Sequence, residues 1–154
     1  MRWIVGFLVL AVVVGCGGNS DNKSAEMAKQ SLIRLIADGR QQNNVDTLQR
    51  LTELDNIAQE WADYYETRQT PAIQTHDAPP SDLLTQWNVG DLKEKVNQEL
   101  QALGITAQTA EGKVVINDNN SVSDAYDKFG GSAQNSWLMK SEWEYVGVGY
   151  TSYE

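Results

Sequence analysis

The sequence is poor in the side chains that most often bind metals or form cross-links. It contains one cysteine, Cys16, and one histidine, His76. A single cysteine excludes disulfides within the chain, and a single histidine excludes a zinc site built from several histidines. Basic residues are also scarce, 12 against 21 acidic ones, which gives a formal net charge of −9. Because an acidic surface repels phosphate groups, we expect no nucleic-acid partner.

Long apolar runs are also lacking, except for one at the N-terminus, Ile4–Val14. It is shorter than the roughly 20 residues of a membrane-spanning helix, and it follows Arg2, as in a signal peptide. The motif Val-Val-Gly-Cys that ends at Cys16 resembles the site read by a bacterial lipoprotein signal peptidase. We therefore expect a signal peptide over residues 1–15, and a lipidated Cys16 with a flexible tether over residues 16–28. The alternative is an uncleaved membrane anchor.

This N-terminus predicts a protein of the bacterial cell envelope, held to the membrane by lipid on Cys16. Gly17 follows the cysteine, where an aspartate is associated with retention in the inner membrane, so the outer membrane is favoured. The remaining residues, 29–154, are numerous enough for one domain with one core.

The pattern of this domain predicts helices first and strands later. One apolar stripe with three- and four-residue spacing indicates an amphipathic helix that belongs to the core; its residues are Leu51, Leu54, Ala58, Trp61 and Tyr65. We expect helices over Leu32–Asp38, Leu48–Thr67, Leu92–Leu103 and Ser121–Phe129, and strands over Lys113–Ile116 and Tyr145–Thr151.

The last of these strands, YVGVGYT, carries two glycines on one face, Gly147 and Gly149. Glycines that share a strand face indicate that another backbone or a side chain packs very close to it.

These segments, in this order, resemble the CAP superfamily, also called the SCP domain, of cysteine-rich secretory, antigen 5 and plant pathogenesis-related proteins. The matching segments are LIRLIADGR (Leu32–Arg40), LTELDNIAQEWADYY (Leu51–Tyr65), His76, LKEKVNQELQALG (Leu92–Gly104), AEGKVVI (Ala110–Ile116) and the stretch Val122–Tyr150 that ends in YVGVGY. The resemblance implies an α+β fold, a three-layer α-β-α sandwich around a small antiparallel sheet. In the family another strand usually follows VGVG, and by this resemblance we expect that strand to be missing or replaced in the sheet.

CAP domains place two histidines and two acidic residues around a central cavity, which in some members binds a divalent metal. By this resemblance His76 matches the first histidine, and Glu111, or alternatively Lys113, matches the glutamate of a strand. Gln134, or Asn135 with one gap, stands where the second histidine would be. The resemblance therefore implies a binding cleft of His76, Glu111, Gln134 and Asn135. With one imidazole lost, His76 would bind a divalent metal far less well than a two-histidine site, and we expect no cofactor.

Since Gln134 cannot exchange a proton near neutral pH, we expect non-catalytic binding of a small apolar or peptide-like ligand, or of an envelope partner. The alternative is a hydrolase, protease-like or active on the cell wall, that uses His76 with Glu111. A third hypothesis is an interaction module that buries Trp137 and Trp143 against a partner. The expected partners are thus the membrane, through the lipid anchor, and an unknown ligand or envelope protein.

Overall fold

The computed structural model describes residues 6–15, 22–66, 68, 74–117 and 121–153. The helices are α1 (Asn22–Gln42), α2 (Thr52–Glu66), α3 (Ser81–Trp87), α4 (Leu92–Leu100) and α5 (Val122–Lys128), with 3-10 turns η1 (Gln101–Leu103) and η2 (Trp137–Met139). The strands are β1 (Gly6–Gly15), β2 (Gln49–Arg50), β3 (Gln74–His76), β4 (Thr109–Asn117) and β5 (Trp143–Tyr153). Within these ranges no helix is both long and apolar enough to cross a membrane.

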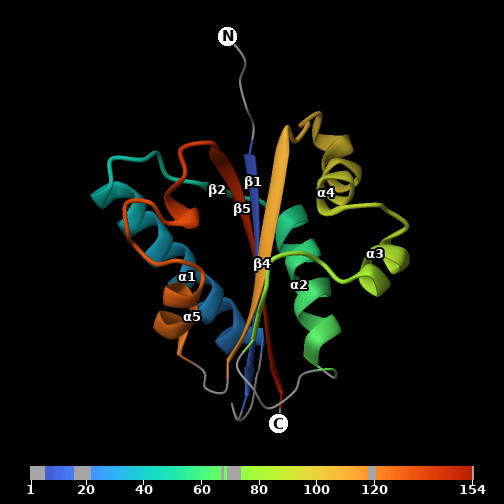
Figure 1. Cartoon of the computed structure of the whole chain (residues 1–154), viewed down its shortest axis with the longest axis horizontal. Helices are drawn as coiled ribbons and strands as arrows, with labels where there is room; N and C mark the ends of the chain where they lie inside the picture. Colours follow the sequence, from blue (N-terminus) through green and yellow to red (C-terminus); the bar gives the residue numbers. More distant parts are fainter. Residues whose placement is uncertain (1–5, 16–21, 67, 69–73, 118–120, 154) are drawn as a thin grey trace.

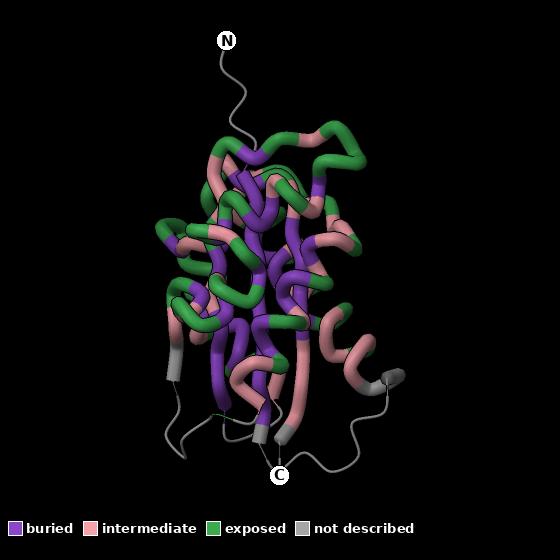
Figure 2. Tube along the Cα trace, turned by 90° about the vertical axis from the view of Figure 1, so that its right-hand side faces the viewer, coloured by how far each residue is buried: buried purple, intermediate pink, exposed green. Residues whose placement is uncertain are grey.

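The strands form one sheet in the order β2-β5-β1-β4-β3, with helices on both faces. Helices α1 and α5 cover one face, and α2, α3 and α4 lie on the other, so the expected three layers are present (Figure 1). The tube in Figure 2 shows that burial is concentrated in the sheet between the two helical layers.

The prediction of an antiparallel sheet is wrong. Strand β1 pairs in parallel with both β4 and β5, and β2 pairs in parallel with β5. Among the strands that the structure describes, only β3 and β4 pair in an antiparallel direction. The reason is the central position of β1, which the prediction did not include in the sheet at all. A parallel strand that is covered on both faces requires a nearly continuous apolar run, and the N-terminal run supplies one.

The side chains of β1 are buried on both sides of the sheet, and Phe7–Val14 are at most 4% exposed. Phe7 and Val9 pack with α2 and α4, whereas Leu8 and Leu10 pack against α1 and α5. The segment predicted as a signal peptide is therefore the central strand of this structure. Cys16 and its lipid attachment lie outside the described residues. Helix α1 begins at Asn22, so the second half of the predicted tether is helical.

Helix α2 packs directly on β5 where the two glycines lie. A Cβ on Gly147 would lie 2.2 Å from the carbonyl carbon of Leu54, and one on Gly149 would lie 2.3 Å from that of Ala58. Real Cβ atoms do not approach other heavy atoms so closely. The expectation of a close backbone approach at these glycines is thus confirmed, and the partner is the backbone of α2.

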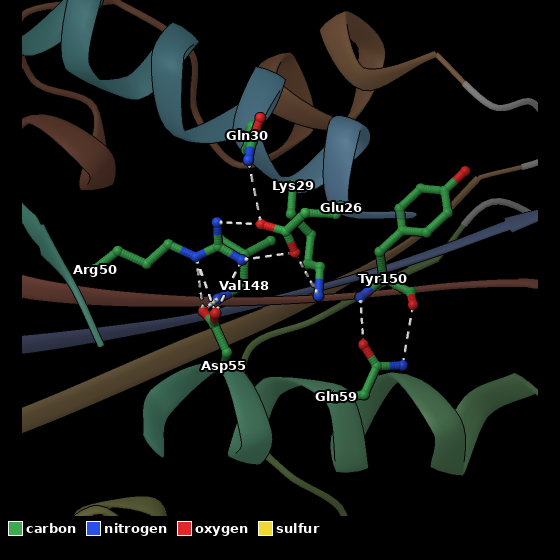
Figure 3. A network of polar contacts seen from close by, with 8 residues as sticks. All are labelled: Glu26, Lys29, Gln30, Arg50, Asp55, Gln59, Val148 and Tyr150. Atoms are coloured by element: carbon green, nitrogen blue, oxygen red, sulfur yellow. Dashed lines mark hydrogen bonds and ion pairs between the residues drawn. The ribbon is translucent and has the colours of Figure 1, made fainter. Parts of the chain in front are cut away.

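Side chains of α2 also cover the outer edge of β5, beyond the two residues that β2 pairs (Figure 3). Asp55 Oδ1 accepts a hydrogen bond from Val148 N at 2.8 Å. Gln59 accepts from Tyr150 N at 3.1 Å and donates to Tyr150 O at 3.0 Å, so its amide pairs as a neighbouring strand would. The N–H group of Val148 and both backbone polar groups of Tyr150 are therefore satisfied without another strand.

Arg50 holds this network to α1. Its guanidinium contacts Asp55 at 2.9 Å and Glu26 of α1 at 2.9 Å. The hydrogen bond from Arg50 is the main reason why the pKa of Glu26 is lowered. The network thus connects helices on opposite faces of the sheet around the edge of β5.

A second arginine, Arg40, is fully buried at the end of α1. Its Nε donates to Asp46 O at 2.7 Å, its Nη1 to Leu138 O at 2.7 Å and Lys140 O at 3.0 Å, and its Nη2 to Trp143 O at 3.2 Å. Burial lowers the pKa of Arg40, and the charge of Asp46 opposes this shift. Because all four acceptors are backbone carbonyls, Arg40 fixes the path of the chain from η2 into β5.

Candidate binding groove

His76 is the last residue of β3 and lies opposite Val114 of β4. Its ring stacks on that of Tyr65 from α2, with centroids 4.9 Å apart and planes 10° from parallel. Burial raises the pKa of the Tyr65 hydroxyl. Residues directly opposite each other in a ladder share a face, so His76 lies on the sheet face that α2 and α4 cover.

Glu111 is exposed on β4, and its Oε1 accepts a hydrogen bond from Trp137 Nε1 at 3.4 Å. The ammonium of Lys113 lies 4.9 Å from the centroid of the Trp137 ring and 3.7 Å from Asp77 Oδ1. Trp137 packs against the core on the α1 and α5 face. Glu111 and Lys113 therefore belong to that face of β4.

The structure does not bring His76 and Glu111 together. Val114, which pairs with His76, is three residues from Glu111 along β4, a separation of roughly 10 Å at about 3.3 Å per residue. An odd number of residues along a strand also places two side chains on opposite faces. The two candidate catalytic groups thus point away from each other across the sheet.

Gln134 and Asn135 are both exposed, in the connection between α5 and η2. Ser132, just before them, hydrogen bonds to Tyr126 of α5 at 2.7 Å, and its carbonyl accepts from Asn43 at 3.0 Å. The connection therefore lies on the side of the sheet that α1 and α5 cover. Glu111 lies on the same side, and His76 lies on the other.

The two tryptophans of the third hypothesis have different environments. Trp143 is 1% exposed, and its Nε1 donates to Trp137 O at 2.7 Å. The chain itself thus buries Trp143, which leaves it unavailable to a partner. Trp137 is half-buried, and its ring meets that of Trp143 edge-on at 6.2 Å.

A groove of about 650 Å³ lies beside the outer edge of β4. Its walls are the loop after β3, one residue of α3, the start of α4 and the first half of β4. The lining residues are Asp77, Ala78, Pro79, Leu84, Gly90, Asp91, Leu92, Lys93, Gln108, Thr109, Ala110, Glu111 and Gly112. Of the four predicted cleft residues, Glu111 is among those that line this groove. Asp77, the residue directly after His76, lines it as well.

The groove combines an apolar lining with a charged rim. Leu84, Leu92 and Ala110 supply apolar surface, whereas Asp77, Asp91, Lys93 and Glu111 supply charge. Local sequence explains its shape on the α4 side, because Asp91 accepts a hydrogen bond from Glu94 N at 2.8 Å and so begins the helix there.

The described residues contain no group of three or more His, Cys, Asp or Glu side chains that could hold a metal ion. What the groove offers chemically is an apolar surface with fixed charges at its rim, which suits binding more than proton transfer.

The chain matches the family model of the CAP, cysteine-rich secretory protein family, over residues 33–154. The match begins inside α1 and leaves β1 outside. No curated protein and no solved structure matches the chain significantly. Because the family model covers most of the sequence, this chain belongs to the CAP, cysteine-rich secretory protein family.

Proposed function

We propose that this CAP domain is a non-catalytic binding module that takes a small apolar or peptide-like ligand in the groove beside β4. The observation that carries the proposal is the groove itself. Its volume of about 650 Å³ is within the roughly 300–1,000 Å³ that ligand sites occupy. An apolar lining with few charged groups at the rim is also the usual composition of such sites.

The hydrolase alternative has less support. General acid–base catalysis needs two titrating groups within reach of the same substrate atoms. His76 and Glu111 are on opposite faces of the sheet. The His76 ring stacks on Tyr65, whereas the Glu111 carboxylate accepts a hydrogen bond from Trp137. A substrate in the groove would meet Glu111 at its rim, without an imidazole beside it.

Lipid attachment at Cys16, and with it the location in an envelope, stays a prediction from sequence. Removal of residues 1–15 would also remove β1, which pairs with both β4 and β5. Residues 1–15 can therefore be cleaved as a signal peptide or supply β1 to this sheet, but not both in the same molecule.

The proposal is tested by filling the groove. Ala78 lines it and is exposed, so Ala78→Trp should obstruct it without disturbing the core. Ala133→Trp, at an exposed alanine of the α5–η2 connection, is the matched control. The full chain, labelled with ¹⁵N, is screened by NMR against a library of small apolar acids, amines and short peptides.

We expect compounds that shift the amides of the groove, with affinities at least about ten-fold weaker for Ala78→Trp and unchanged for Ala133→Trp. Compounds that bind equally well to both variants would contradict the proposal. Turnover of peptide, ester or peptidoglycan substrates that is lost in both His76→Ala and Glu111→Gln would favour the hydrolase instead.

A further inference from the structure

The central strand β1 lies between β5 and β4, and the outer edges of these two neighbours are covered to different extents. On β5, Asp55 and Gln59 bond to the backbone of Val148 and Tyr150, beyond the residues that β2 pairs. On β4, strand β3 pairs only with Val114–Ile116. The preceding residues, Thr109–Lys113, pair with β1 on one side, and no strand within the described ranges pairs with them on the other. This free edge of β4 faces the groove.

We propose that the groove binds an extended, basic peptide segment of a partner protein, which adds to the sheet as a strand along Thr109–Lys113. This inference rests on the proposed binding function and specifies its ligand. A free edge presents N–H and C=O groups from alternate residues, and only an extended backbone supplies donors and acceptors at the same repeat. The free edge spans roughly 16 Å, at about 3.3 Å per residue, enough for a peptide of about five residues.

The walls of the groove match the side chains of such a strand. A strand added to β4 would direct its residues alternately to the two faces of the sheet. On one face they would meet the apolar surface of Leu84 and Leu92 at the α3 and α4 wall. The chain bends at Asp77 and Ala78, just after the pairing of β3 with β4 ends at His76, and the groove lies between this bend and the first half of β4.

The charge of the rim selects a basic peptide. Three acidic residues, Asp77, Asp91 and Glu111, line the groove with one basic residue, Lys93. Lys113, at the end of the free edge, lies 3.7 Å from Asp77 Oδ1, so the site keeps an acidic surplus of one charge, carried by Asp91 and Glu111 against Lys93. The same charges disfavour a second copy of this chain, because pairing two β4 edges would bring two acidic rims together. The chain as a whole, with a net charge of −9, adds to the attraction for a cationic partner.

The test begins with a display library of random nonapeptides selected on the immobilised full chain. Affinities of the selected peptides are measured by fluorescence anisotropy for the natural sequence, Ala78→Trp and Ala133→Trp. We expect selected peptides to be rich in Lys or Arg with apolar residues at every second position, and to lose affinity only with Ala78→Trp. Enrichment of Asp and Glu would overturn the charge argument.

Strand addition is then tested by methylating each backbone nitrogen of one selected peptide in turn. We expect an alternating pattern, in which every second N-methyl group weakens binding roughly ten-fold or more, because it removes a hydrogen bond to β4 and blocks close approach. Peptides that bind in the groove without this alternation would refute strand addition and leave the binding function intact. Peptides whose affinity is insensitive to Ala78→Trp would refute the proposed function itself.

Discussion

Removal of β1 is the perturbation with the largest expected effect on this fold. A chain that begins at Gly17 lacks the central strand and its side chains, of which Phe7–Val14 are at least 96% buried. Full burial of a large apolar side chain stabilises by about 1.5–3 kcal/mol. The seven such side chains in this strand thus represent roughly 10–20 kcal/mol, an upper bound because unfolded chains already bury some surface. A domain has a total stability of only about 5–15 kcal/mol.

We therefore expect the chain that begins at Gly17 to lose cooperative unfolding and near-ultraviolet circular dichroism. The full chain carrying Cys16→Ser is the control, because it lacks the same thiol but keeps β1. A shortened chain that unfolded at the same temperature as the control, with the same spectra, would contradict the central role of β1. That result would also mean that the remaining strands close the sheet alone, as a cleaved signal peptide requires.

The other predictions concern contacts of single side chains and are measured by denaturant unfolding. Gly149→Ala should destabilise the protein by at least the roughly 1–3 kcal/mol of an overpacked core, since its Cβ would lie 2.3 Å from Ala58 C. A change below about 0.5 kcal/mol, half of the smallest expected effect, would contradict this close approach. Arg40→Met should cost about 3–5 kcal/mol, because four carbonyls lose their donor, and a near-neutral result would disprove that role. Gln59→Leu should cost about 1–3 kcal/mol and promote self-association at β5; a chain that stays equally stable and monomeric by light scattering would argue against edge protection by Gln59.

Local patterns predicted the positions of four of the five described helices, without α3, and one close contact. The stripe of Leu54, Ala58 and Trp61 predicted the buried face of α2, and all three are fully buried. The same helix was predicted to begin at Leu48 but begins at Thr52, because Gln49 and Arg50 pair with β5. That pairing depends on residues nearly a hundred positions away, which no local pattern reports.

The central strand could not be recognised from its own residues. A continuous apolar run is typical both of a buried parallel strand and of a signal peptide, and the arginine before the run and the cysteine after it favoured the latter. The family match over residues 33–154 excludes this segment as well. The position of β1 is thus the feature of this structure that sequence predicted least.

The candidate site was only partly predictable for a similar reason. The sequence indicated a cleft near His76 with Glu111, and the groove does lie between the loop after His76 and β4. Which face each side chain occupies depends on the register of β3 on β4, which pairs His76 with Val114. A shift of that register by one residue would have moved His76 to the face of Glu111.

The most direct test of the binding account is an amide map of the full chain with and without a selected peptide. Chemical shifts and hydrogen exchange of every assigned backbone amide would be compared. We expect the changes to concentrate in Thr109–Lys113, with smaller ones over residues 77–78 and 90–93 on the facing wall. Changes that concentrate instead around Gln134 and Asn135, with Thr109–Lys113 unaffected, would contradict it.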